Sequence, residues 1–348
     1  MPRLSRRILV PAVVSALVRL SSPAFACDST ACAVAMRYTD GAMTSGQWRF
    51  DFSVRHVDQS RRLYGSQSTS QVYRPRIDLA GGGFEAATHQ ELSASMTFLQ
   101  IEVSRGITGS LSAYATLPVY RQTSVDSLHF IPPVLDAAGN TPVEPGHEHP
   151  GVPTGTTFAM HNSADGFGDL QVGLRQGVWS SGSREITAGL TVKLATGSAK
   201  VAGIDGVVDP MMQPGTGAAD FVGSLQYTQK VRSTGVSVTA SMQKATTSAA
   251  GYRYGDDAVL ALGASHPISP RVTGHVLLKG QRAGRHRFDG SGVPSTGLTL
   301  VLVSPGVRYR LRPDIGLYAT MQIPAWVRVN ESQLGPRATL SAGFVKAF

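Results

Sequence analysis

The sequence of 348 residues predicts an all-β protein, a transmembrane antiparallel up-and-down β-barrel of about twelve strands with short periplasmic turns and long outer loops. Three observations predict this fold. Apolar and polar residues alternate with a period of two, short and long connections alternate between the segments that carry this pattern, and an export signal comes before them.

The export signal lies in the first 26 residues. Three arginines within the first seven residues form a cationic start, an apolar run covers residues 8–18, and Ala24-Phe25-Ala26 has the small-x-small pattern of a cleavage site. The run is too short to cross a bilayer as a helix, which needs about 20 apolar residues. We therefore expect a signal peptide at 1–26, an N-terminal periplasmic segment at 27–46 and the barrel at 47–348.

The charge and the cysteines agree with an exported chain. The formal charge of +9 includes four arginines of the signal peptide, which leaves +5 for the mature chain without a block of Lys or Arg. Nucleic-acid binding would need a concentrated basic face and is excluded on this ground. Cleavage would make Cys27 the first mature residue, and two alternatives stay open for it: lipid modification, or a disulfide with Cys32 in an oxidising compartment.

The strand pattern is clearest from Ile107 to Val119, where every second residue is apolar or glycine and the residues between are mostly Ser and Thr. Such alternation indicates a strand with one apolar and one polar face. The segment 88–104 carries a phase slip near Gln100, where the outward row moves from Phe98 to Ile101, and a β-bulge would explain it. Twelve segments follow the pattern, at residues 47–57, 88–104, 107–121, 167–178, 184–196, 219–231, 235–245, 257–267, 271–284, 297–310, 314–327 and 336–348.

The connections between these segments alternate in length without exception. Tight links such as 105–106 and 232–234 separate long ones at 57–87, 122–166 and 197–218. In single-chain outer-membrane barrels the hairpins are tight on the periplasmic side, the outward loops are long, and the number of strands is even. A membrane strand needs about 9–11 residues, which these segments reach, whereas strands of soluble sandwiches have about five or six. The alternative is a soluble β-sandwich or β-helix with one solvent-exposed face.

The polar rows predict a water-filled interior, and the apolar rows predict a surface that faces lipid. A closed barrel satisfies every backbone hydrogen-bonding group, as hydrocarbon requires. The candidate pore-lining residues are Arg49, Asp51, Arg55, Glu102, Arg175, Lys193, His275 and Lys279. The last strand ends in Phe348 after alternating apolar residues, which resembles the C-terminal signal of bacterial barrel assembly, although Lys346 stands where an apolar residue is usual.

Three motifs resemble a known family. Asp165-Gly166-Phe167-Gly168-Asp169-Leu170, Leu190-Thr191-Val192-Lys193-Leu194-Ala195-Thr196-Gly197 and Gly215-Thr216-Gly217-Ala218-Ala219-Asp220 are similar to motifs of the outer-membrane transporter family named after the meta pathway of phenol degradation. They cover about a fifth of the chain. The resemblance implies an outer-membrane channel or transporter without naming its substrate.

The motifs also have a structural interpretation. Glycines at 166, 168, 215 and 217 permit positive φ where a long loop enters a strand, and Asp169 and Asp220 can cap the turns with side-chain hydrogen bonds. We favour these rim turns over a ligand site.

Histidines suggest a metal site as an alternative chemistry. His147-Glu148-His149 lies in the longest outer loop and His161 follows it, so that imidazoles and a carboxylate could hold Zn²⁺ or Cu²⁺. A solvated loop is the simpler interpretation. A lipid hydrolase at the rim, with His129 and Asp126, is a further alternative, but no nucleophile motif supports it.

We therefore expect a channel that passes small solutes, aromatic, hydrophobic or metal-related, across the outer membrane. No enzymatic activity, catalytic residue or cofactor is expected. The expected partners are outer-membrane lipid, the barrel-assembly machinery through Phe348, and the solute. The charge predicts mild anion preference. Twelve strands lie between filled and water-carrying barrels, so the pore is either open or plugged by the 122–166 loop.

Overall fold

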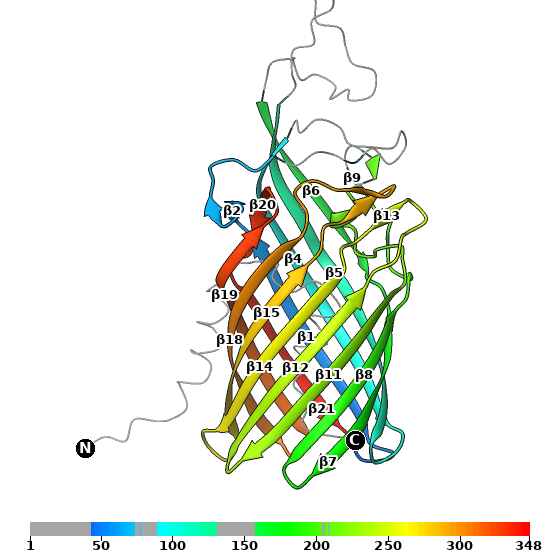
Figure 1. Ribbon diagram of the computed structural model, residues 1–348, viewed down its shortest axis with the longest axis vertical. Helices are drawn as coiled ribbons and strands as arrows, with labels where there is room; N and C mark the ends of the chain where they lie inside the picture. Colours follow the sequence, from blue (N-terminus) through cyan, green and yellow to red (C-terminus); the bar gives the residue numbers. More distant parts are fainter. Residues whose placement is uncertain (1–42, 74–76, 78–88, 131–156, 204–205, 208) are drawn as a thin grey trace, which may run out of the picture.

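The structure, a computed structural model, describes residues 43–73, 77, 89–130, 157–203, 206–207 and 209–348. One antiparallel sheet dominates this part of the chain and curls into a closed barrel (Figure 1). Its strands are β1 (Trp48–Gln59), β4 (His89–Gly106), β5 (Leu111–Phe130), β6 (Thr157–Phe167), β7 (Gln171–Ser181), β8 (Arg184–Lys193), β11 (Asp220–Val231), β12 (Thr234–Lys244), β14 (Asp257–Pro267), β15 (Val272–Ala283), β18 (Leu298–Arg312), β19 (Ile315–Val329) and β21 (Thr339–Ala347).

The order of the strands shows how the ring closes. Neighbours follow the sequence β4-β1-β21-β19-β18-β15-β14-β12-β11-β8-β7-β5-β6, and a further pairing of β4 with β5 completes the circle. β7 pairs with residues 111–116 of β5 and β6 pairs with residues 119–130, so these two strands follow one another along the same neighbour. The thirteen strands of the described sheet therefore occupy twelve positions around the ring, as the sequence predicts.

The tight hairpins all lie at one end of the barrel, which we call the hairpin end. They connect β4 to β5, β7 to β8, β11 to β12, β14 to β15 and β18 to β19. The chain begins and ends its barrel there too: Trp48 is paired with Arg105, and the amide of Phe348 donates to the carbonyl of Trp48 at 2.9 Å (Figure 1). In barrels of this kind the hairpin end faces the periplasm.

One predicted loop is partly strand. β5 continues to Phe130 and β6 begins at Thr157, so residues 122–130 and 157–166 form a ladder that rises above the barrel at the other end (Figure 1). A hairpin outside the bilayer needs no continuous apolar face, which explains why the period-two pattern misses it. Residues 131–156 lie outside the described part, and the described flanks rise outward.

The two faces of the barrel have opposite chemistry. The outward face carries half-exposed leucines such as Leu190 at 57% and Leu225 at 53%, whereas the inward Lys279 is fully buried. Phe344 of β21 packs outward between Phe50 and Phe52 of β1, with ring centroids 5.9 and 5.8 Å apart. An apolar outer surface on a closed sheet is what hydrocarbon requires, because no backbone group is left unpaired.

The predicted phase slip in the second strand is wrong. Phe98 points inward, is 5% exposed and packs with its ring 5.3 Å from that of Tyr120. The register shift lies between the pairs Thr97–Gln122 and Phe98–Tyr120, so β5 carries the extra residue, Arg121. The sequence suggested a slip because the inward row of β4 changes from polar to apolar toward the outer end.

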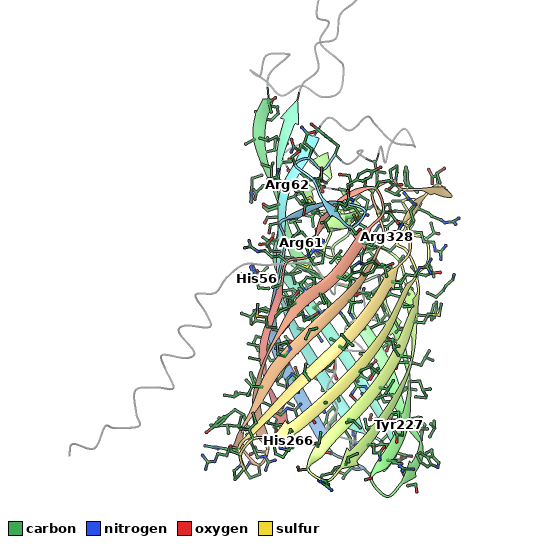
Figure 2. The ribbon with its side chains drawn as sticks, turned by 60° about the vertical axis from the view of Figure 1, so that its left-hand side comes forward. His56, Arg61, Arg62, Tyr227, His266 and Arg328 are labelled. Atoms are coloured by element: carbon green, nitrogen blue, oxygen red, sulfur yellow. The ribbon has the colours of Figure 1, made fainter. Side chains whose placement is uncertain are left out.

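The end opposite the hairpins is covered by short elements, which we call the outer cap. These are β2 (Arg61–Tyr64), β3 (Gln67–Ser68), β9 (Ala202–Gly203), β10 (Gly206–Val207), η1 (Pro210–Met212), β13 (Tyr252–Arg253), β16 (Arg287–Phe288), β17 (Ser291–Gly292) and β20 (Ser332–Gly335). Figure 2 shows Arg61 and Arg62 of this cap near the outer end, together with Arg328 of β19.

The outer cap is held by apolar side chains that enter the barrel. Leu63 of β2 packs on Leu300 and Leu302 of β18 and on Val327 and Val329 of β19. All five are buried, and this cluster alone contributes several kcal/mol at about 1.5–3 kcal/mol for each fully buried aliphatic side chain. The part of the interior between β2, β18 and β19 is therefore apolar.

A second part of the cap is aromatic. Tyr252 and Phe288 form a buried cluster with Ile77 and Val293, and Met211 of η1 packs against it. The carbonyl of Pro210 accepts a hydrogen bond of 2.5 Å from the Tyr254 hydroxyl. The predicted loop 197–218 thus reaches across the outer end.

The signal peptide, Cys27 and Cys32 lie outside the described residues, as does most of the predicted periplasmic segment. Within the described residues, no helix has both the length and the apolar character needed to span a membrane.

Candidate functional site in the barrel interior

The three family-like motifs meet at one buried ion cluster near the outer end of the interior. The Lys193 ammonium lies 2.9 Å from Asp169 Oδ2 and 3.0 Å from Asp220 Oδ2, and all three side chains are at most 7% exposed. The ammonium also contacts the Thr216 hydroxyl and donates to the Ala218 carbonyl at 3.2 Å. We call Asp169, Lys193 and Asp220 the motif cluster.

Both carboxylates of the motif cluster also fix the backbone of the loops. Asp169 accepts hydrogen bonds from the amides of Gly197 at 2.9 Å and Thr216 at 2.8 Å, and Asp220 accepts from the amide of Thr246 at 3.0 Å. Gln243 donates to Asp220 at 2.9 Å. Charged hydrogen bonds of this kind are shorter and stronger than neutral ones. Asp169 and Asp220 therefore cap their turns as predicted, and through Lys193 they join three loops.

The glycines of the motifs serve two different purposes. Gly166 and Gly217 have φ of +147° and +66°, as predicted. The prediction is wrong for Gly168 and Gly215, which lack positive φ and instead permit close approach. A Cβ on Gly215 would lie 2.5 Å from the carbonyl carbon of Gly197, so only glycine lets these backbones touch.

A second charged group lies nearer the hairpin end, where Ser112 of β5 pairs with Gly106 of β4 and with Arg175 of β7. Arg175 Nη2 of β7 donates to Glu102 Oε1 of β4 at 3.1 Å, and its guanidinium stacks 4.1 Å from the ring centre of Tyr114. Glu102 also accepts from the hydroxyls of Ser104 and Thr116. This buried pair links strands on either side of β5.

The remaining predicted pore-lining residues point inward from two strands, β1 and β15. Asp51 accepts a 2.7 Å hydrogen bond from the Tyr318 hydroxyl, and the Arg55 guanidinium lies 5.2 Å from the ring centre of Phe98. His275 Nε2 is 3.0 Å from the Thr320 hydroxyl, and Lys279 is fully buried. The structure therefore brings together Glu102 with Arg175, whereas Lys193 belongs to the motif cluster.

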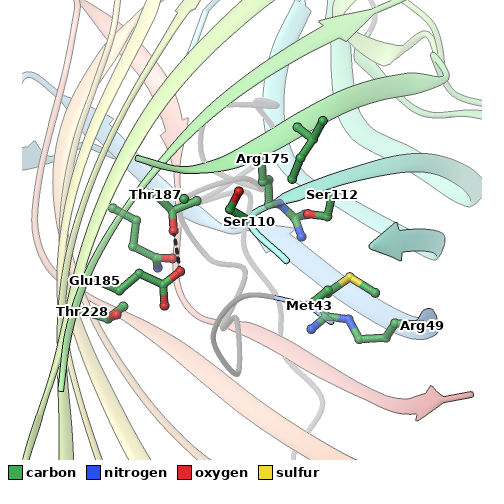
Figure 3. A pocket seen from close by; sticks show the side chains of 11 residues that line it. Met43, Arg49, Ser110, Ser112, Arg175, Glu185, Thr187 and Thr228 are labelled. Carbon is green, nitrogen blue, oxygen red and sulfur yellow. Dashed lines mark hydrogen bonds between the residues drawn. The ribbon is translucent and has the colours of Figure 1, made fainter. Parts of the chain in front are cut away.

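A pocket, which we call the inner pocket, opens at the hairpin end of the interior (Figure 3). It holds about 490 Å³ of empty space, counting the part that is open to solvent. Its lining includes Met43, Arg49, Ser110, Arg175, Glu185 and Thr228. Arg49 and Arg175 are predicted lumen residues. Glu185 was missed, because β8 opens with Arg184-Glu185 and a charged pair beside a turn also suits a solvated hairpin.

The proposed metal ligands divide between described and undescribed parts. His147 and His149 lie outside the described residues. His161 Nδ1 is 2.7 Å from Asp126 Oδ1 on the β5–β6 ladder, and the same carboxylate accepts from the Ser93 hydroxyl at 2.8 Å. The hydrogen bond from His161 lowers the pKa of Asp126. Among the described residues, no group of three or more His, Cys, Asp or Glu could hold a metal ion.

Comparison with solved structures identifies the fold. The COG4313 outer membrane channel from Pseudomonas putida F1 is similar with a TM-score of 0.59 and 11% identity, over 90% of this chain and 100% of that chain. The toluene transporters TodX of P. putida and TbuX of Ralstonia pickettii are weaker likenesses, with TM-scores of 0.44 and 0.41 and identities of 12% and 15%. They cover 88% and 94% of this chain and 91% and 96% of their own. The fold assignment does not depend on these two.

Sequence comparison identifies the family. No curated protein sequence matches the chain. The model of a family that is described as the MetA-pathway of phenol degradation matches residues 85–335. This range is well over half of the chain and includes all three motifs. Single-chain barrels of this build are outer-membrane proteins, and the apolar outward face of the sheet agrees with that location. The chain therefore belongs to the family named for the MetA-pathway of phenol degradation.

Proposed function

We propose that the protein is a channel that passes small solutes across the outer membrane through the interior of its barrel. The observation that carries the proposal is the mixed interior of the closed barrel, which holds an apolar cluster at the outer end, two buried ion-paired groups, and an open pocket at the hairpin end. A solute that crosses the interior meets apolar, charged and solvated surroundings. Small molecules with both an apolar and a polar part suit this path.

The mechanism we propose is diffusion without an enzymatic step. Selectivity would come from the charged side chains that face the lumen, as in other pores. Arg49, Asp51, Arg55, Glu102, Arg175, Lys193, His275 and Lys279 are the proposed pore-lining residues. Insertion of the barrel would use the C-terminal Phe348 as its signal to the assembly machinery.

A rim hydrolase receives less support. A hydroxyl nucleophile needs its base within hydrogen-bond reach. Here the Ser93 hydroxyl donates to the Asp126 carboxylate, and the imidazole that contacts this carboxylate is that of His161. The His129 side chain lies outside the description.

The proposal is tested by reconstituting the mature protein into planar bilayers and into liposomes. We expect discrete conductance steps and the entry of a neutral sugar such as arabinose into loaded liposomes. Reversal potentials in opposed salt gradients should show mild anion preference, because the mature chain carries +5. Protein that folds and inserts but gives neither current nor sugar entry would contradict the proposal.

A further inference from the structure

We infer that the inner pocket binds a small zwitterion of the amino acid type, with its carboxylate at Arg49 and its ammonium at Glu185. This inference rests on the proposed channel function and names the class of solute that the hairpin end of the lumen selects.

The first observation is a guanidinium without an acceptor. Arg49 lies inward on β1, its side chain lines the inner pocket, and its Nε is buried without a hydrogen-bond partner. Among the described residues it takes part in no ion pair. A buried polar group without a partner is unfavourable, and more so when it is charged, so an incoming acceptor would satisfy this side chain. A carboxylate suits a guanidinium best because it can accept two parallel hydrogen bonds.

The second observation is a carboxylate on the opposite wall. Glu185 lies inward on β8 and its Oε1 accepts a hydrogen bond from the Thr187 hydroxyl at 3.2 Å. No cationic side chain of the described residues pairs with it. In Figure 3, Met43 and Arg49 stand on one side of the pocket, and Glu185, Thr187 and Thr228 stand on the other. Two opposite charges thus line one pocket without forming an ion pair with each other.

The third observation concerns Arg175, the other cation of the pocket. Its guanidinium is already paired with Glu102 at 3.1 Å, so it contributes a hydrogen-bond donor and little net charge. Ser110, Ser112 and Thr228 add hydroxyls to the lining. Arg49 and Glu185 therefore determine which ligand is accepted.

These charges exclude ligands of a single sign. A simple carboxylate at Arg49 would face the Glu185 carboxylate, and a simple amine at Glu185 would face the Arg49 guanidinium. Like charges placed together disfavour the wrong ligand, and specificity often depends on such repulsion. A zwitterion can pair its carboxylate with Arg49 and its ammonium with Glu185 at the same time.

Binding is measured by equilibrium dialysis of the detergent-solubilised protein with alanine, lactate and propionate, which share three carbons and a carboxylate. We expect alanine to bind best, then lactate, then propionate, with about tenfold between the first and the last, the size of one charge-assisted hydrogen bond. Equal binding of alanine and propionate, or no binding of alanine, overturns the inference. This ranking needs no variant.

Variants then assign the two charges. Glu185→Gln should reduce the preference for alanine over propionate to about threefold or less. Arg49→Gln should weaken the binding of all three ligands, and Arg49→Lys should restore only part of it, because an ammonium keeps the charge but not the two parallel hydrogen bonds. Arg105→Gln and Asp314→Asn, on exposed residues at the same end of the barrel, serve as matched controls and should change nothing. An unchanged preference in folded Glu185→Gln also overturns the inference.

Liposome entry separates this inference from the proposed function. If arabinose enters and the three acids show no ranking in binding, the channel stands and the zwitterion site fails. If alanine is bound with the expected ranking but no solute enters, the site stands and the channel function fails.

Discussion

The Lys193 ammonium lies 2.9 Å from the Asp169 carboxylate, although the two residues are 24 positions apart in the sequence. Neither side chain is more than 7% exposed. Lys193 ends β8, and Asp169 lies in the short link between β6 and β7. The ion pair therefore joins the outer end of β8 to the link between β6 and β7. Asp220 at the start of β11 completes the cluster from the next strand along.

Removal of the Lys193 charge should destabilise the outer end of the barrel. Lys193→Met would leave two carboxylates buried side by side, and breaking a buried pair in this way costs about 3–5 kcal/mol. The urea midpoint of unfolding, followed by the electrophoretic mobility of the folded form, should fall accordingly. Lys230→Met, at an exposed lysine of β11, is the control and should leave the midpoint unchanged. Equal midpoints for both variants would show that the cluster contributes nothing to stability.

Glu331 should make one part of the outer cap sensitive to acid. Its carboxylate accepts hydrogen bonds from Arg285 at 3.0 and 2.5 Å and from the amide of Ser295 at 2.6 Å. The hydrogen bond from Arg285 is the main cause that lowers the pKa of Glu331, and burial opposes it more weakly. A group with a depressed folded-state pKa stabilises the fold above its unfolded pKa, and this contribution is lost as the pH falls through the folded value.

We therefore expect the rate of protease cleavage at residues 285–295 to stay constant down to about pH 4.3, the ordinary glutamate pKa, and to accelerate as the pH falls further. Glu331→Gln keeps the shape and removes the titration, so its cleavage rate should be high throughout and nearly independent of pH. Asp314→Asn, at an exposed turn of the opposite end, controls for general effects of charge. A wild-type rate that does not change with pH would refute the role of Glu331.

The sequence predicts the wall of the barrel well and its ends poorly, for a physical reason. A strand between lipid and lumen must alternate, so 257–267 is predicted with the bounds that β14 has. Outside the bilayer the constraint disappears: the ladder of 122–130 with 157–166 carries no clear alternation and was predicted as loop. Phe98 shows the same limit inside, because an apolar side chain on an inward row looks like a change of face.

The interior chemistry is predictable in kind but not in pairing. Alternation places Glu102 and Arg175 on inward rows, but their contact depends on a β5 strand lying between them in the ring. Tyr114 is a further example, since its hydroxyl contact with Thr191 and its stacking under Arg175 need the register of three strands. Arg49 and Glu185 lie 136 residues apart in the chain, and only closure of the ring makes them face one pocket.

Gly197 should tolerate no side chain, although it lies in a loop. A Cβ there would sit 2.6 Å from the carbonyl carbon of Gly168 and 2.8 Å from the Cα of Gly215, so Gly197→Ala must push the three motif loops apart. Overpacking of this kind costs about 1–3 kcal/mol. Gly223→Ala is the matched control, because a Cβ on Gly223 meets no atom within 4 Å. Urea midpoints should fall for the first variant and not for the second, and a reversed order would contradict the close approach.

A charge on the outward face should disturb the barrel according to its depth in the bilayer. Leu262 lies near the middle of β14 and is 46% exposed on the outward face, whereas Leu311 lies at the hairpin end and is 49% exposed. Arginine costs about 2–4 kcal/mol at the midplane of a membrane barrel and about 0–1 kcal/mol near the interface. Leu262→Arg should therefore reduce the stability measured by reversible folding into lipid vesicles, while Leu311→Arg should have little effect. The two leucine side chains have about the same exposed fraction, so a soluble barrel would tolerate both substitutions alike. Equal stability of the two variants would therefore contradict a membrane-spanning barrel.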